Sequence, residues 1–171
     1  VWLSLKNAGE LCPVIADALG RADPDHAESY RANAAAYMEK LTALEGRYRA
    51  AVDAAPVKTL LFGDRFPFRY FVEDYGYEYY AAFAGCSAET EASFETIAFL
   101  AQKADEIGAG TIFTIEGGNT DIAEAVIANT RTKDQKTAKL NSLQSVTAEQ
   151  IAEGATYVSL MSENLEVLRE A

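Results

Sequence analysis

Apolar side chains in the first third of the chain recur with the period of a helix. Between residues 26 and 53 they are Tyr30, Ala34, Tyr37, Leu41, Leu44 and Tyr48, at alternating steps of four and three residues. This spacing places them on one face of an amphipathic helix. At 1.5 Å of rise per residue, a helix over 26–53 is about 40 Å long, roughly the width of a small domain. Since Gly46 weakens it only locally and Pro56 is the first strong stop, we expect one continuous helix that connects or backs lobes.

A shorter helix and a turn precede the long one. Residues 6–19 carry apolar side chains on one side, as an amphipathic helix does: Leu11, Val14, Ile15, Ala18 and Leu19. We expect Gly20 to end this helix, because glycine is a common residue at helix stops. Asp23-Pro24-Asp25 then makes a turn and supplies a cap for the long helix.

After Pro56, short apolar runs alternate with helical patterns. The expected strands are 59–62, 77–84, 111–115 and 136–143. The expected helices are 66–75, 93–108, about 120–129, and a last helix that starts at a capping box of Thr147 and Gln150 and runs to Arg169. Strands that alternate with helices form a parallel sheet with right-handed crossovers. The sequence therefore predicts an α/β fold, with a parallel sheet of about four strands flanked by helices and one long backbone helix.

Composition limits the classes of function. The chain has 171 residues and a formal net charge of −11, which fits one acidic domain and argues against a surface for nucleic acid. No apolar run has the length of a membrane span. Because Val1-Trp2-Leu3 is an abrupt apolar start without an initiator methionine, we expect a fragment of a longer protein, and a missing signal or anchor says nothing about its location.

Cysteine and histidine, which often serve in catalysis or metal binding, are scarce. Cys12 and Cys86 are the only cysteines, without a CxxC pattern, which favours two separate thiols over a disulfide. His26 is the only histidine and lies beside Pro24 and Asp25 at a helix start. A lone, solvated histidine is a poor catalyst without partners, so no catalytic triad is evident.

Polar residues follow the expected strands at three places: Gly63-Asp64, Glu116-Gly117-Gly118 and Asn141-Ser142. In open α/β sheets, ligands bind outside the carboxyl ends of the strands. Asp64 and Glu116 could share a divalent cation, or each could cap the helix that follows it. Asp64 could also act as a phosphoacceptor or general base, although a companion lysine at another strand end is not evident. The glycine-rich segment could bind an anion or form a plain tight turn.

Several segments, taken in order, resemble one family. They are Val1-Trp2-Leu3-Ser4 with Asn7-Ala8, the long tyrosine-rich helix, Phe62-Gly63-Asp64 with Tyr70-Phe71, Phe113-Thr114-Ile115-Glu116, and Tyr157-Val158-Ser159-Leu160-Met161 with Asn164-Leu165. Together they cover essentially the whole chain, which resembles the C-terminal half of the zinc and manganese solute-binding proteins of ABC transporters. The resemblance implies two α/β lobes joined by the long helix, with a metal in the cleft between them.

The resemblance also implies a set of metal ligands. One histidine comes from the N-terminal lobe and a second from an Asp-Pro-His just before the Val-Trp, where this chain begins. A third ligand, His or Glu, follows the strand over 60–62, where this chain has Gly63 and then Asp64. A fourth, Asp, lies in a loop where this chain has Asn141, and the additional acid of the family is present as Glu116. The metal ligands implied for this chain are Asp64, Glu116 and Asn141. Because Gly63 has no side chain and Asn141 is neutral, the site is weakened or moved relative to that of the family, or is specialised for something other than tight zinc binding.

We therefore expect residues 1–171 to be a single lobe that includes the connecting helix 26–53, with the N-terminal lobe absent. The expected function is the metal-binding component of an ABC importer, which carries zinc or manganese to a membrane permease. It acts in the periplasm or anchored at the cell surface, without catalysis and without nucleic acid. The alternatives are a degenerate lobe that binds a non-metal solute or a protein partner, and a flavodoxin-like phosphorelay or enzyme domain that uses Asp64.

Overall fold

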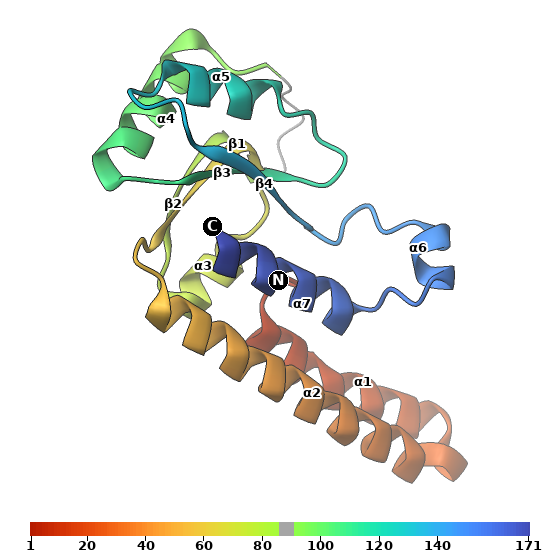
Figure 1. Cartoon of the computed structure of the whole chain (residues 1–171). Coiled ribbons are helices and arrows are strands. Elements are labelled where there is room, and N and C mark those ends of the chain that lie inside the picture. Colours follow the sequence, from red (N-terminus) through yellow and green to blue (C-terminus); the bar gives the residue numbers. More distant parts are fainter. Residues whose placement is uncertain (86–90) are drawn as a thin grey trace.

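A computed structural model describes residues 1–85 and 91–171 (Figure 1). The helices are α1 (Leu5–Ala22), the 3-10 helix η1 (Pro24–His26), α2 (Ala27–Ala54), α3 (Arg69–Tyr75), α4 (Phe94–Ile107), α5 (Asp121–Asn129), α6 (Ala148–Ala152) and α7 (Tyr157–Glu170). The strands are β1 (Thr59–Phe66), β2 (Glu78–Ala84), β3 (Thr111–Ile115) and β4 (Lys136–Leu140). This order confirms the expected alternation of strands and helices after the long helix.

The strands form one parallel sheet in the order β2-β1-β3-β4. Helices α4 and α5 cover one face, while α2, α3 and α7 lie on the other (Figure 1). Neighbouring residues of a strand point to opposite faces, so Leu61 and Ile112 belong to the core under α4 and α5. Phe62 and Phe113 belong to the core on the opposite face. The predicted α/β fold, with a parallel sheet flanked by helices, is confirmed.

The long helix is continuous, as the apolar pattern predicted. Helix α2 runs through Gly46 without a break. Tyr48 is fully buried and fixes α2 to the body of the protein, because its hydroxyl donates a 2.6 Å hydrogen bond to the carbonyl of Met161 in α7. The ring also packs on Phe71 and Tyr75 of α3. Burial raises the pKa of the Tyr48 hydroxyl, which therefore remains a donor.

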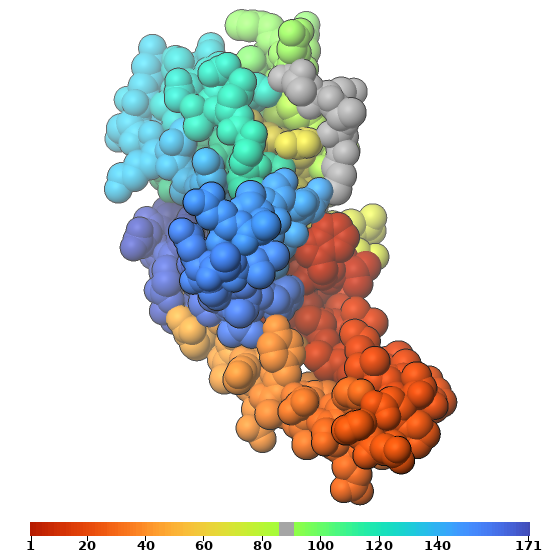
Figure 2. Space-filling model, turned by 90° about the vertical axis from the view of Figure 1, so that its right-hand side faces the viewer, coloured from red at the N-terminus to blue at the C-terminus, as the bar shows by residue number. Residues whose placement is uncertain are grey.

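Helices α1 and α2 form a hairpin that extends away from the sheet (Figures 1 and 2). The expectation that Gly20 ends α1 is wrong, because α1 continues to Ala22. Gly20 instead lets the helices approach, since a Cβ there would lie 3.1 Å from the Cβ of Ala27. The apolar stripe of α1 is 45–60% exposed and consists of Leu11, Val14, Ile15 and Leu19. No helix in the described ranges combines the length and apolar character needed to cross a bilayer.

Strand β1 is longer than its apolar run. The sequence predicted a strand that stops at residue 62 and a helix that starts at Phe66, but β1 continues to Phe66 and α3 begins at Arg69. Asp64 therefore lies inside a strand, not after one. Pro67 lies between the two elements instead of in the first turn of the helix. The physical reason is that β1 pairs with β2 again beyond its irregularity, Arg65 with Phe83 and Phe66 with Ala84, and the apolar run does not reveal this contact.

The end of the chain also differs from the expectation. The capping box of Thr147 and Gln150 is present, but it starts only the short helix α6. Gly154 then adopts a positive φ of 96°, which an α-helix cannot accommodate. Thr156 begins the separate helix α7 with a capping box of its own, formed with Ser159. The single last helix of the prediction is therefore two helices, and β4 ends at Leu140 instead of residue 143.

One buried side chain fastens the loop after β4 to α7. The Oδ1 atom of Asn164 accepts a 2.7 Å hydrogen bond from the Asn141 N–H, and its Nδ2 donates a 2.8 Å bond to the Asn141 carbonyl. Asn164 is only 4% exposed. Its amide therefore pairs with both polar groups of one residue, as the backbone of a neighbouring strand would.

We expect Asn164→Ala to lower the free energy of unfolding of the chain by about 2–3 kcal/mol, because the partly buried N–H and carbonyl of Asn141 both lose their partner. Urea denaturation of both proteins measures the difference. Asn129→Ala is the matched control, since the side chain of this exposed asparagine donates to the carbonyl of Ala125 in its own helix. It should change stability by no more than about 0.5 kcal/mol. Equal losses in the two variants would contradict the special role of Asn164.

Candidate functional site

The three predicted metal ligands lie at the carboxyl ends of three strands. Asp64 is near the end of β1, Glu116 directly follows β3, and Asn141 directly follows β4. Because the strands are parallel, these ends share one edge of the sheet. We call the surroundings of these residues, together with the loop 141–144, the carboxyl edge.

Asp64 joins the two central strands. The pairing of β1 with β2 is irregular between Phe62 and Arg65. At this point the Asp64 Oδ2 accepts a 3.1 Å hydrogen bond from the Ile115 N–H of β3, and Oδ1 accepts a 2.7 Å bond from the Arg65 N–H. The Nε of Arg65 lies 3.6 Å from Oδ1. Asp64 is 7% exposed, so these charge-assisted bonds to the backbone satisfy a nearly buried carboxylate.

Two glycines provide the space for this arrangement. A Cβ on Gly63 would lie 2.6 Å from the Cα of Ala123, so α5 meets β1 at backbone distance. A Cβ on Gly118 would collide with the Asp64 carboxylate. Gly117 adopts a positive φ of 70°, which makes the segment after β3 a tight turn. The glycines at 63 and 118 are therefore required by packing.

The carboxylate of Glu116 is directed towards the loop after β4. Its Oε2 accepts a 2.6 Å hydrogen bond from the Ser142 N–H. Its Oε1 accepts a 2.5 Å bond from the Ser142 hydroxyl and a 3.2 Å bond from the Gln144 N–H. Ser142 is fully buried, whereas Glu116 is half-buried. Glu116 is therefore a fixed carboxylate that retains access to solvent.

Asn141 has a structural task in the same loop. Its Oδ1 accepts a 2.8 Å hydrogen bond from the Leu143 N–H, two residues later. This side-chain turn supports the positive φ of 60° at Leu143. The backbone of Asn141 is held by Asn164. The amide oxygen of Asn141 therefore already has a donor, and its role as a metal ligand stays a prediction.

Hydrogen bonds connect the three candidates in series. Asp64 bonds to the residue before Glu116, and Glu116 bonds to Ser142, the residue after Asn141. The start of the chain joins them, because the indole Nε1 of Trp2 donates a 2.9 Å bond to the Ser142 carbonyl. Within residues 1–85 and 91–171, no group of three or more His, Cys, Asp or Glu side chains is placed to hold a metal. This part of the chain thus presents fixed oxygens at an edge, not a closed metal centre.

The sequence did not reveal the parts played by Arg65 and Ser142. Arg65 supplies both an amide and a cation to Asp64, and the adjacent Asp-Arg pair was the available signal. Ser142 was visible as a polar strand end, but its bond to Glu116 joins residues 26 positions apart. No local pattern predicts such a contact.

The remaining chemical candidates of the sequence take no part in the carboxyl edge. His26 lies in η1 at the turn of the α1–α2 hairpin, exposed, with its Nδ1 2.8 Å from Asp23 Oδ2. Cys12 is half-buried on α1, and Cys86 lies outside the described residues, so the state of the two thiols stays a prediction. The aromatic group before and within α3 is mostly core: Phe66, Phe68, Phe71 and Tyr75 are buried, and Tyr70 is 42% exposed.

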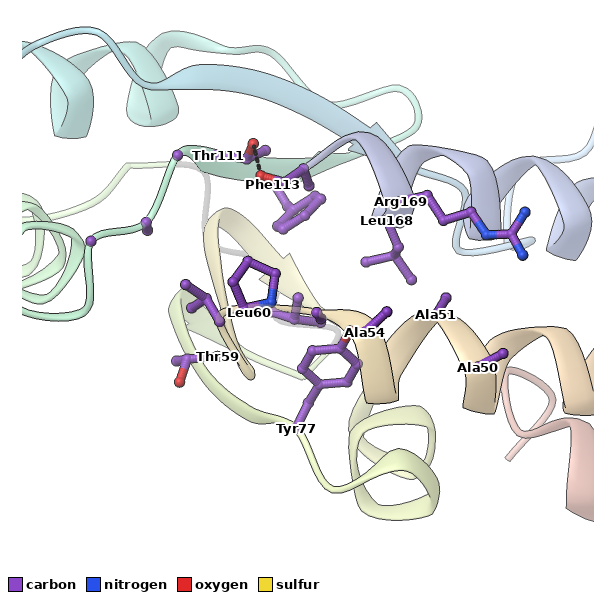
Figure 3. A pocket seen from close by; sticks show the side chains of 17 residues that line it. Ala50, Ala51, Ala54, Thr59, Leu60, Tyr77, Thr111, Phe113, Leu168 and Arg169 are labelled. Atoms are coloured by element: carbon purple, nitrogen blue, oxygen red, sulfur yellow. Dashed lines mark hydrogen bonds between the residues drawn. The ribbon is translucent and has the colours of Figure 1, made fainter.

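A cavity of about 570 Å³ lies at the opposite edge of the sheet (Figure 3). Thr59 and Thr111, the first residues of β1 and β3, mark its position at the amino ends of the strands. The side chains around it are mostly apolar, among them Leu60, Tyr77 and Leu168. None of the described residues that line it has a carboxylate or imidazole side chain. This cavity therefore lacks the chemistry of a metal site, and the carboxyl edge is the better candidate.

Comparisons with known proteins agree with this fold. The model of a family described as zinc-uptake complex component A, periplasmic, matches residues 1–171. The zinc-binding lipoprotein AdcA of Streptococcus pneumoniae is 34% identical over 172 residues, which cover 99% of this chain and 33% of AdcA. The chain thus spans about a third of the length of that relative.

Solved structures show the same fold. The Zn(II)-bound ZnuA-like domain of Streptococcus pneumoniae AdcA matches with a TM-score of 0.79 and 32% identity, over 99% of this chain and 62% of that one. The metal-dependent lipoprotein YcdH from Bacillus subtilis matches with a TM-score of 0.84 and 28% identity, over 100% of this chain and 62% of that one. The resemblance found in the sequence is thereby confirmed, and the chain belongs to the family of the periplasmic zinc-uptake complex component A.

Proposed function

We propose that this chain is the C-terminal lobe of an extracytoplasmic solute-binding protein that carries zinc to an ABC permease in the membrane. The observation that carries the proposal is the match of the whole chain to a zinc-binding lipoprotein, with the fold of a Zn(II)-bound domain. These relatives support zinc over manganese as the cargo and a location outside the cytoplasm. The function includes no covalent chemistry. Affinity comes from metal ligation, and delivery comes from recognition of the loaded shape by the permease.

An N-terminal lobe completes the proposed site. The chain spans 33% of AdcA and 52% of the zinc uptake protein ZnuA of Bacillus subtilis. The exposed apolar stripe of α1 supports a covering lobe, because burial of apolar surface contributes about 25 cal/mol per Å². The bond from the Trp2 indole to the Ser142 carbonyl places the first residues of this chain beside the carboxyl edge, which supports an N-terminal lobe that faces this edge.

Glu116 is the proposed principal ligand of this lobe. It combines a fixed carboxylate with access to solvent, as described above. We propose that Asp64 and Asn141 also contact the metal, through the side-chain oxygen lone pairs that their hydrogen bonds to the backbone leave free. Zinc prefers four ligands that include nitrogen, sulfur or charged oxygen, so the other lobe supplies the rest. A reactive role for Asp64 in a flavodoxin-like enzyme is not favoured, because two backbone amides already hold its nearly buried carboxylate.

The isolated chain should bind zinc only weakly, because one lobe provides an incomplete ligand set. Titration calorimetry of residues 1–171 with zinc should show no submicromolar site. Submicromolar binding that survives the double change Asp64→Ala and Glu116→Ala would place the site elsewhere in the chain.

In the full-length protein, Glu116→Gln should reduce the stabilisation by zinc, because a neutral amide is a weaker ligand than a carboxylate. A ligand that binds only the native state at 100 times its Kd stabilises by about 2.7 kcal/mol, so thermal unfolding with and without zinc measures the loss. Glu73→Gln, at an exposed carboxylate paired with Arg69, is the control and should leave the zinc response intact. An unchanged zinc response in Glu116→Gln would remove Glu116 from the ligand set.

Asp64→Asn should affect both states of the full-length protein. The amide nitrogen would face a backbone N–H, so the metal-free protein should lose about 1–3 kcal/mol of stability. The zinc response should also shrink if the remaining acceptor capacity of Asp64 binds the metal. Thermal unfolding with and without zinc separates the two effects. A loss of stability with an unchanged zinc response would assign Asp64 to the fold alone.

A further inference from the structure

The hydrogen bonds to Glu116 use most of its capacity to accept. A carboxylate offers about four acceptor positions, two on each oxygen. Among the residues that the structure describes, Oε1 receives both the Ser142 hydroxyl and the Gln144 N–H, whereas Oε2 receives the Ser142 N–H alone. The free position therefore lies on Oε2. A cation that leaves the loop in place can bind this carboxylate through one oxygen only.

Ser142 is itself held from three directions. Its hydroxyl and its N–H both point to Glu116, at 2.5 and 2.6 Å. Its carbonyl accepts the 2.9 Å bond from the Trp2 indole. The preceding residue, Asn141, is fixed to the buried Asn164 of α7. Ser142 is fully buried, so its hydroxyl cannot turn to solvent as an alternative. The side chain is therefore a rigid support for Glu116.

We propose that Ser142 is a positioning residue for the metal: it occupies Oε1 of Glu116 and so makes this carboxylate a ligand through Oε2 alone. The inference rests on the proposed function, because it concerns the same site. One-oxygen ligation suits the tetrahedral coordination of zinc. Larger hard cations favour more oxygens and two-oxygen carboxylate contacts. Ser142 therefore also biases the site towards zinc and against cations that need a higher coordination number.

The first test is the zinc affinity of the full-length protein with Ser142→Ala. Loss of a group that orients a metal ligand typically weakens metal binding 10–100-fold, and we expect a weakening of about this size. Ser162→Ala is the matched control, because its hydroxyl donates to the Val158 carbonyl within α7, away from the carboxyl edge. It should leave the zinc affinity unchanged. Competition with a chromophoric chelator measures both affinities at a temperature where each metal-free variant is folded.

The second test reads the geometry of the bound metal with cobalt(II) in place of zinc. Wild-type protein should give the intense visible bands of a tetrahedral site. In Ser142→Ala the freed Oε1 can join the metal, so the bands should weaken towards a higher-coordinate spectrum. Ser142→Thr keeps the hydroxyl and should restore the tetrahedral spectrum. Trp2→Phe removes the indole N–H at a half-exposed residue, so it tests the same support without a change in the buried loop, and we expect a smaller loss of affinity.

Glu116→Gln separates the failure of this inference from that of the proposed function. If Glu116→Gln weakens zinc binding while Ser142→Ala and Trp2→Phe both bind zinc and cobalt as the wild type does, the positioning role of Ser142 is overturned and the zinc site stands. If Glu116→Gln also binds zinc normally, Glu116 is no ligand and both proposals fail at this residue. If Ser142→Ala does not fold, the Trp2→Phe result decides, and a wild-type affinity there overturns the positioning role.

Discussion

A carboxylate side chain completes the centre of the sheet at its carboxyl edge. Asp64 accepts one N–H from β3 and one from its own strand, in a place where β1 has lost its regular pairing. A buried carboxylate without such partners would be costly, and a buried N–H without an acceptor would be costly as well. The Asp64 carboxylate and the Ile115 N–H therefore depend on each other to be buried without a large cost in free energy. The position of the turn after β3, and with it that of Glu116, follows from this contact.

From that contact, polar bonds continue outwards along the edge. Glu116 reaches the loop after β4, and Asn164 and Trp2 hold that loop from α7 and from the start of the chain. Among the described residues, no buried side-chain nitrogen or oxygen lacks a hydrogen-bond partner. A fully satisfied network of this kind fixes side chains in one arrangement. The protein itself therefore holds the polar side chains of the carboxyl edge in place.

The parts of the fold that depend on local periodicity could be predicted from the sequence. These include the alternation of strands and helices, the unbroken α2 and the cap at Thr147. The true end of β1 could not, because it depends on the pairing of Arg65 and Phe66 with residues of β2. Topology alone placed three candidate ligands at one edge. The oxygens of Asp64 and Glu116 accept hydrogen bonds from Ile115 and Ser142, which are 51 and 26 positions away, and only the folded chain brings these residues together.

Gly63 is a position at which a metal-ligating side chain would be hard to introduce. The resemblance to metal-binding relatives implies a His or Glu ligand at this point of the strand, and any such side chain would place its Cβ 2.6 Å from the backbone of Ala123. A backbone atom cannot rotate aside as a side chain can, so α5 itself would have to move. A single substitution therefore cannot restore that ligand. During evolution, the close packing of α5 on β1 and the set of metal ligands would have to change together. The spacing between strand and helix would therefore restrict changes in metal specificity.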